Sequence, residues 1–314
     1  MSTVPQHVFE AVDEALSTLE QRHEIVIPLA VAHGSHGWGG AGPDSDYDVA
    51  FVFVPRDLRQ YAHLEGPEET IVDDRDDLEF QGLDIRRFAE LLADSNESAI
   101  DIVRSPIRYR EEYDPRDLSA YVERSYNPID LYHDWRAIAG TNYRKYLSEH
   151  LVRDGETYPI VERREDDGDA LEYVVRTDDG TETVAADDKR YAETQTRPTV
   201  KRNLTICRAA MYARYLRTTG ERGEHDLPAI SFAEFLSEQA PTVFDDERLE
   251  LVRDLLERKR TGDGDEEIGD AVGREFAHPE REIDPAVHAC DGPDPGRLDE
   301  FVDEIIDSAA PTRL

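Results

Sequence analysis

The chain has 314 residues and a formal net charge of −35, with 71 acidic residues against 36 basic ones. Its basic residues are 32 Arg and only 4 Lys, a balance that, beside the acidic excess, is typical of proteins adapted to high salt. Its two cysteines, Cys207 and Cys290, are too few for a disulfide framework, and no apolar run approaches the ~18–20 residues of a membrane span.

Length and terminal sequence set two further expectations. A chain of this size should form two domains, because single cores stop growing at ~150–250 residues. The N-terminus carries acids where a signal peptide has a basic region, so we expect a cytoplasmic protein without membrane association. The negative charge would ordinarily argue against a nucleic-acid partner, but in molar salt the Debye length is only ~3 Å and screening removes that objection.

The N-terminal elements are expected to be a helix and two strands. A helix is predicted over residues 5–22, because its apolar residues recur at helical spacing. A buried strand should follow at 25–32, and VAFVFV at 49–54 is typical of a strand covered on both faces. Between them, the glycines and Pro43 of HGSHGWGGAGPDSDYD are expected to prevent regular structure.

The next elements are shorter and lead into a helical region. A strand is predicted over 77–83, followed by a helix that Asp84 caps and by a short helix over 98–103. From residue 126 the pattern becomes helical, with predicted helices beginning at Asn127-Pro128 and covering 199–219, 231–240, 245–260 and 297–309. We therefore predict domains at 1–125 and 126–314, with a β-hairpin or small meander inserted at about 155–195.

Asp46 and Asp48 are the first candidates for chemistry. Strand residues two apart point to the same side, so these carboxylates should project together at the start of the 49–54 strand. Such a pair suits two divalent cations, Mg²⁺ or Mn²⁺, because Mg²⁺ prefers a few carboxylates together with phosphate oxygens. Gly34 and Ser35 are the candidate phosphate ligands, since a glycine turn lets backbone N–H groups approach phosphate closely.

A carboxylate pair of this kind usually recruits a third acid. Glu79 lies in an otherwise apolar strand. Because a charged side chain in such a setting is usually paired or binds a metal, Glu79 is the first choice for the third acid. Asp84 is the alternative, although its position before a helix also suits an N-cap. The predicted metal ligands and catalytic acids are therefore Asp46, Asp48 and Glu79, with Asp84 kept as the alternative third acid.

The spacing of these residues resembles a known signature. Gly34-Ser35, ten intervening residues and Asp46-x-Asp48 resemble the DNA polymerase β nucleotidyltransferase superfamily. Blocks within residues 25–240 narrow the resemblance to YcgL-type predicted nucleotidyltransferases, which include the RNA-ligase-associated RlaP group: SHGWGGAGPDSDYDVAFVFV, LEFQGLDIRRFAELLADSNESAIDIVRSPIRY, LYHDWRAIAGTNYRKYL and VKRNLTICRAAMYARYL. Glu79 stands where the family pattern has Asp.

The resemblance implies a fold and a site. The fold is α/β (α+β), a polymerase-β-like core whose small mixed sheet we expect to carry helices on one side, followed by a mainly helical domain that closes over the cleft. Lys201 and Arg208 are seven residues apart and should share a helix face opposite Leu204 and Met211. A basic helix of this kind resembles a triphosphate or polynucleotide clamp, so both are predicted nucleotide-binding residues beside Gly34 and Ser35.

The implied activity is metal-dependent nucleotidyl transfer. A nucleoside monophosphate would pass from an NTP, with ATP expected, to an acceptor hydroxyl as pyrophosphate leaves. The expected acceptor is an RNA or tRNA 3′ end, because more than half of the chain lies outside the α/β core. A protein hydroxyl, as in minimal nucleotidyltransferases that adenylylate toxins, is the alternative acceptor. A nucleotide-binding regulator without catalysis is a third hypothesis, which the intact carboxylate pair disfavours.

Overall fold

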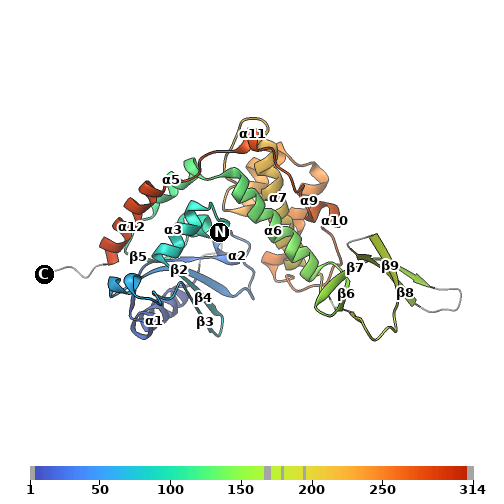
Figure 1. Cartoon of the computed structure of the whole chain (residues 1–314), viewed down its shortest axis with the longest axis horizontal. Helices are drawn as coiled ribbons and strands as arrows, with labels where there is room; N and C mark the ends of the chain where they lie inside the picture. Colours follow the sequence, from blue (N-terminus) through green and yellow to red (C-terminus); the bar gives the residue numbers. More distant parts are fainter. Residues whose placement is uncertain (1–3, 166–170, 178–179, 194–195, 310–314) are drawn as a thin grey trace.

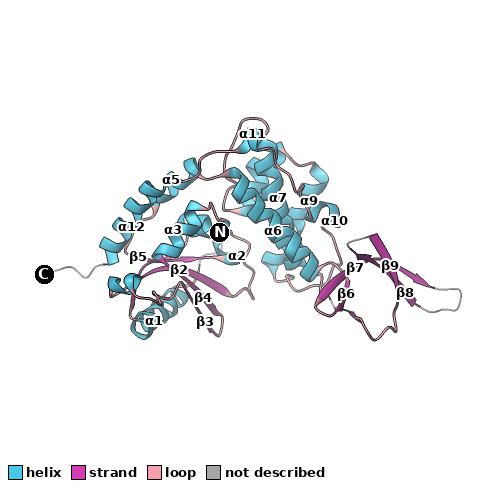
Figure 2. Ribbon diagram, in the orientation of Figure 1, coloured by secondary structure: helices cyan, strands magenta, loops and turns pink. Residues whose placement is uncertain are grey.

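The computed structural model describes residues 4–165, 171–177, 180–193 and 196–309. Figures 1 and 2 show an N-terminal sheet with helices on it, an array of longer helices beside it, and a second sheet at the far edge of the molecule. This is the mixed α/β core followed by a helical region that the sequence predicts. None of the helices within the described ranges is long and apolar enough to span a bilayer.

The N-terminal sheet is mixed, with strand order β3-β4-β2-β1-β5. β2 and β4 run parallel, and the other neighbouring pairs are antiparallel. The predicted strands appear as β1, β2 and β4, whereas β3 and β5 are edge strands that the sequence pattern did not indicate. The bounds are β1 (Ile25–Ala32), β2 (Tyr47–Pro55), β3 (Thr70–Arg75), β4 (Leu78–Asp84) and β5 (Arg108–Glu111).

Helices cover both faces of this sheet, so the expectation of helices on one side is wrong. α1 (Gln6–His23) packs on the face that carries Val49, Phe51 and Phe53 of β2. The alternate residues of β2 join a separate, larger apolar cluster on the other face, with α3 (Ile85–Ala93) and α4 (Glu97–Arg104). The continuous apolar run at residues 49–54 of β2 is itself typical of a strand whose two faces are both covered.

The helical array is built around α7 (Val200–Gly220), which packs most extensively against α6 (Pro128–Tyr146) and also against α9 (Asp246–Thr261). α7 is buried around most of its circumference, as expected of a helix in the middle of such an array. Shorter elements complete the region: α5 (Arg116–Ser125), α8 (Phe232–Glu234), a π-turn (Phe235–Gln239), a 3-10 turn (Ala240–Thr242), α10 (Arg274–Ala277) and α11 (Pro285–His288).

The C-terminal helix α12 (Pro295–Ala309) returns to the N-terminal part of the chain. It packs against α3 and lies beside β1, as Figure 1 shows. The larger apolar cluster includes residues from β1 through α12, so it is continuous across residue 125. The division of the chain at 125 into two domains stays a prediction, and α12 lies with the first of them.

A second sheet, antiparallel and of order β10-β6-β7-β8-β9, stands where the hairpin or small meander was predicted. Its small core contains Leu151, Tyr173, Val175 and Val184, separate from the rest of the apolar interior. The turns expected at 166–169 and 178–179 lie outside the described residues. The bounds are β6 (His150–Arg153), β7 (Glu156–Glu165), β8 (Leu171–Thr177), β9 (Gly180–Ala185) and β10 (Ala192–Glu193).

Candidate active site

The Gly34-Ser35 segment forms the short helical turn α2 (Gly34–Gly37) directly after β1, where no regular structure was expected. The backbone N–H of Gly37 donates to the carbonyl of His33 at 3.0 Å, and the backbone N–H of Trp38 donates to the carbonyl of Gly34 at 3.2 Å. Gly34 has φ +50°, in the left-handed region that favours glycine. One glycine therefore lets the chain turn from a buried strand straight into α2.

Gly34 also makes room for Asp48. A Cβ atom at Gly34 would lie 1.9 Å from Asp48 Oδ2, well inside van der Waals contact. The backbone N–H of His33 donates to the Asp48 carbonyl at 2.8 Å, which ties the end of β1 to the start of β2. The Asp48 carboxylate is thus held against the backbone of α2, and the two halves of the predicted signature are in contact.

Asp46 and Asp48 lie on the sheet face that looks toward the helical array. Along β2, Val49 and Phe51 belong to the α1 face, so the alternate positions, including Ala50, belong to the other. Burial is the main cause that raises the pKa of Asp48, and the charge of Asp46 raises it further. A hydrogen bond from the Ser35 backbone opposes this shift, as does His33. The two carboxylates therefore feel each other's charge.

Glu79 lies beside Asp48, whereas Asp84 does not. In the parallel pairing of β2 and β4, Glu79 is the Cα partner of Asp48 and Asp84 is the partner of Phe53. Five residues of strand correspond to roughly 16 Å, and alternation puts Asp84 on the opposite face from Glu79. Burial first, and then Asp48 and Asp46, raise the pKa of Glu79. The geometry favours Glu79 as the third acid.

Asp84 has the structural role that the sequence offered as its alternative. Its side chain accepts a hydrogen bond from the backbone N–H of Arg86 at 2.9 Å and so caps α3. It also accepts from the Tyr61 hydroxyl at 2.5 Å, and it is only 2% exposed. These contacts account for a buried carboxylate at this position.

Lys259, near the C-terminal end of α9, is a site residue that the sequence reasoning missed. It is 9% exposed, and its Nζ donates to the Gly40 carbonyl at 2.8 Å and to Ser45 Oγ at 3.3 Å. Burial, assisted by Lys201, lowers the pKa of Lys259 to about 8, while Asp48 opposes the shift. The scarcity of lysine could have drawn attention to it, since Lys259 is one of only 4 lysines in the chain.

Asp46, Asp48 and Lys259 line one cleft between the N-terminal sheet and the helical array, here called the carboxylate cleft, whereas Gly34 and Glu79 are not among its lining residues. Lys201 lies at its rim and forms an ion pair with Asp265 at 2.6 Å. Basic and acidic groups therefore face each other across a site whose walls come from distant parts of the chain. Its lining residues are Ser35, Gly42, Pro43, Asp44, Ser45, Asp46, Asp48, Lys201, Lys259, Gly262, Gly264 and Asp265.

Arg208 is not brought into this lining. It is 8% exposed, forms an ion pair with Asp101 at 3.1 Å, and lies 4.8 Å from the ring centre of Trp135 and 5.2 Å from that of Trp38. The expected helix face shared with Lys201 is absent because the middle of α7 is buried on nearly all sides. Arg208 instead supports Trp38, which follows the glycine turn.

Asp46 and Asp48 are the residues best placed to hold a divalent cation. Within the described part of the chain, no group of three or more His, Cys, Asp or Glu side chains lies in an arrangement that could hold a metal ion. Mg²⁺ commonly uses only one or two carboxylates and completes its shell with water and substrate phosphates. The oxygen donors at the start of β2 fit that chemistry.

Comparison with known proteins identifies the family. The sequence matches RlaP, the RNA repair pathway DNA polymerase beta family, over residues 8–304. The chain belongs to this family. Membership in the RNA repair pathway DNA polymerase beta family confirms the resemblance inferred from Gly34-Ser35 and Asp46-x-Asp48, and it suggests nucleotidyltransferase chemistry.

A curated relative matches a smaller part of the chain. The uncharacterized protein YcgL of Bacillus subtilis (strain 168) is 29% identical over 144 residues, which are 45% of this chain and 55% of that protein. The chain thus spans about half the length of the curated relative that it matches. The comparison supports membership in the RlaP family and adds no substrate.

Proposed function

We propose that the chain transfers a nucleoside monophosphate from an NTP to a hydroxyl of an RNA acceptor and releases pyrophosphate. The observation that carries this proposal is the carboxylate cleft, in which Asp46, Asp48, Ser35 and Lys259 face one another. Acidic and phosphate-binding groups in one cleft are what a triphosphate with its bound cation requires. The family adds nucleotidyltransferase chemistry and RNA repair as its context.

Asp46 and Asp48 would hold Mg²⁺ or Mn²⁺, and two ions would be held when the Glu79 side chain, on the neighbouring strand, turns toward them as the third carboxylate. When bound, such ions neutralise the triphosphate and the charge that develops on the leaving pyrophosphate. The raised pKa of Asp48 reflects a carboxylate that burial has made costly to ionise, and a bound cation would remove that cost. Cation binding would therefore explain why an acid is buried at position 48.

The remaining groups position the phosphates. Gly34 and Ser35 present backbone N–H groups and a hydroxyl at the start of α2, and Lys259 supplies a positive charge from the opposite wall. Lys201 adds a second charge at the rim, where Asp265 holds it. We expect ATP as the NTP. A preorganised set of donors stabilises the transition state without reorganising water.

The chemical step forms one bond and breaks one. The acceptor hydroxyl oxygen attacks the α-phosphorus, the bond from this phosphorus to the oxygen that bridges it to the β-phosphorus breaks, and pyrophosphate leaves with that electron pair. The proton of the attacking hydroxyl can pass to the Glu79 carboxylate. Its position beside Asp48 places it next to the reacting groups.

The deciding experiment offers each labelled NTP with Mg²⁺ or Mn²⁺, in high KCl, to RNA, DNA and protein acceptors side by side. We expect label on the RNA 3′ end, and none with the Asp46→Asn/Asp48→Asn variant. Label that persists in the double variant would refute the proposed site. Label on a protein acceptor alone would replace RNA by a protein hydroxyl, and nucleotide binding without any transfer would favour a regulator.

A further inference from the structure

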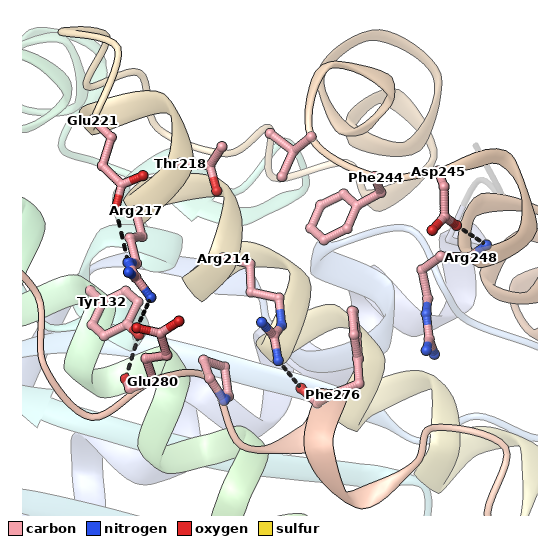
Figure 3. Close-up of a pocket in the computed structure, with 12 residues that line it drawn as sticks. Tyr132, Arg214, Arg217, Thr218, Glu221, Phe244, Asp245, Arg248, Phe276 and Glu280 are labelled. Atoms are coloured by element: carbon pink, nitrogen blue, oxygen red, sulfur yellow. Dashed lines mark hydrogen bonds and ion pairs between the residues drawn. The ribbon is translucent and has the colours of Figure 1, made fainter.

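A second cavity lies between α7, α9 and the segment 272–280, and we call it the arginine cavity (Figure 3). Its volume of about 460 Å³ is within the range of small-ligand sites. It adjoins the end of α7 and the start of α9, whereas the carboxylate cleft adjoins the start of α7 and the end of α9. Arg248 and Lys259 are eleven residues apart on α9, or roughly 16 Å along the helix axis.

Three arginines line this cavity in a chain whose net charge is −35. Arg214 and Arg217 are one helical turn apart on α7, and Arg248 comes from α9. Arg217 is neutralised, because it pairs with Glu221 at 3.1 Å and with Glu280 at 2.5 Å. For Arg214 and Arg248, no carboxylate of the described residues lies within ion-pair distance.

The guanidinium groups of Arg214 and Arg248 are fixed against Phe276. They lie 4.9 Å and 4.0 Å from the centre of its ring, and Figure 3 shows Arg214 between the Arg217–Glu280 pair and Arg248. Arg214 donates to the Glu275 carbonyl at 2.9 Å, and Arg248 donates to the Val272 carbonyl at 3.2 Å. The two positive charges are therefore held in place before any ligand arrives.

These backbone contacts leave donors unused. A guanidinium has five N–H donors, and the backbone carbonyls engage only Nη2 of Arg214 and Nη1 of Arg248. If the arginines only fastened the segment 272–280, one neutral donor at each position would suffice. The carboxylates that line the cavity are engaged elsewhere, because Glu221 and Glu280 pair with Arg217 and Asp245 caps α9. An anion in the cavity would therefore compensate for the desolvation of the two arginines.

We propose that the arginine cavity binds a phosphate group. Guanidinium forks recognise carboxylate and phosphate, but a planar carboxylate is satisfied by a single fork. Arg214 and Arg248 belong to different helices and approach from two sides, which suits an anion whose oxygens do not lie in one plane. The phosphate is either a free one, from an inorganic ion or nucleotide, or the terminal phosphate of a polynucleotide.

The test uses the full chain in buffer with EDTA, in which the metal-free carboxylates of Asp46 and Asp48 repel a phosphate from the carboxylate cleft. Calorimetric titrations compare inorganic phosphate, acetate, and an oligoribonucleotide with either a 5′-phosphate or a 5′-hydroxyl. The substitutions are Arg214→Gln/Arg248→Gln, with Arg253→Gln as the matched control. Arg253 also lies on α9 and donates to a backbone carbonyl, that of Leu236 at 2.9 Å, but it does not line the cavity.

We expect phosphate to bind the parent and the Arg253→Gln variant equally, and acetate to bind more weakly. The Arg214→Gln/Arg248→Gln change should weaken phosphate binding at least about tenfold, the usual worth of a charge-assisted hydrogen bond. Preference for the 5′-phosphorylated oligonucleotide over inorganic phosphate would identify a polynucleotide end as the source, and equal binding would identify a free phosphate. Absence of binding, equal binding of acetate, or unchanged binding in the arginine variant with a normal unfolding curve would overturn the proposal.

Discussion

Gly34 does two things at one position: it adopts a positive φ, and it leaves space for the Asp48 carboxylate. For Gly34→Ala we expect a loss of nucleotidyl transfer of about 100-fold or more, because displacement of a reacting group by 1 Å can cost that much. Transfer is measured by label incorporation, and folding by thermal unfolding. Gly66→Ala is the control, since Gly66 has φ +64° with nothing within 4 Å of an added Cβ. Equal activity loss in both variants would mean that backbone strain is the cause.

The choice between Glu79 and Asp84 is testable with conservative changes. Glu79→Gln should lower transfer by about 100-fold or more, because it removes a carboxylate beside Asp48. Asp84→Asn should leave transfer within about threefold, because Asn caps a helix as well as Asp does. Initial rates and unfolding midpoints are compared for both proteins. Higher activity in the Glu79 variant than in the Asp84 variant would reverse the assignment.

Lys259 should make nucleotide affinity depend on pH. Its pKa is lowered to about 8, so the side chain is charged below that pH and loses its proton as pH rises through it. We therefore expect the NTP to bind more weakly above pH 8, by up to about tenfold per pH unit. Lys259→Met should weaken binding below pH 8 and abolish this dependence. Lys189→Met, at an exposed lysine of the second sheet region, is the control. A persistent pH dependence in the Lys259 variant would assign it to another group.

At the residue scale, the sequence predicted what depends on local chain geometry. Gly34, Ser35, Asp46 and Asp48 lie within one strand-turn-strand unit, so spacing and alternation were enough to bring them together. Lys259 enters the same cleft from α9, and no local pattern connects a helix end with a loop more than 200 residues earlier. Its contact with Gly40 depends on how the helical array packs.

α7 is the element for which helical spacing gave the wrong face. Lys201 and Arg208 lie on one side of an ideal helix, but only the first turn of α7 is exposed there. The middle of the helix is enclosed by α6 and α9, so Arg208 is buried among Trp38, Trp135 and Tyr212. Burial of a cation on a central helix is a tertiary effect that periodicity does not reveal.

This burial makes Arg208 a stability residue. Arg208→Gln should lower the free energy of unfolding by about 3–5 kcal/mol, because it leaves the Asp101 carboxylate buried without its partner. Asp101→Asn in the same chain should recover part of that loss. Urea unfolding in high KCl measures both effects. A loss below about 1 kcal/mol would show that the pair is exposed to solvent in solution.

Among the strands, the sequence pattern identified the apolar central ones and did not identify the more polar edge strands. β1 and the part of β2 after Asp48 are apolar and were identified by composition, as expected for central strands. β3 and β5 are edge strands with mostly polar or partly exposed residues, so nothing in their sequence distinguished them from loops. The helices α3 and α6 were predicted from their caps, Asp84 and Asn127, and the structure shows that Asp245 caps α9 in the same way.

At the scale of the whole molecule, the charge of −35 predicts a stability that depends on salt. Screening weakens repulsion among surface carboxylates, so we expect the midpoint of thermal unfolding to rise by roughly 5 °C or more between dilute buffer and molar KCl. Thermal scans over a KCl series, with loss of secondary structure as the readout, measure this. A midpoint that stays constant or falls across the series would contradict adaptation to high salt.

The glycine loop of residues 39–45 is attached to the end of α9. Lys259 donates to the Gly40 carbonyl, and Arg260 donates to that of Gly39 at 2.9 Å, across 219 and 221 positions of chain respectively. The signature residues are thus complete within a short stretch near the N-terminus, but the shape of the loop beside them depends on a helix synthesised much later. A fragment that ends before α9 would contain every signature residue and still lack a properly formed nucleotide site. If the proposed function holds, nucleotide binding would therefore report that the second half of the chain has folded.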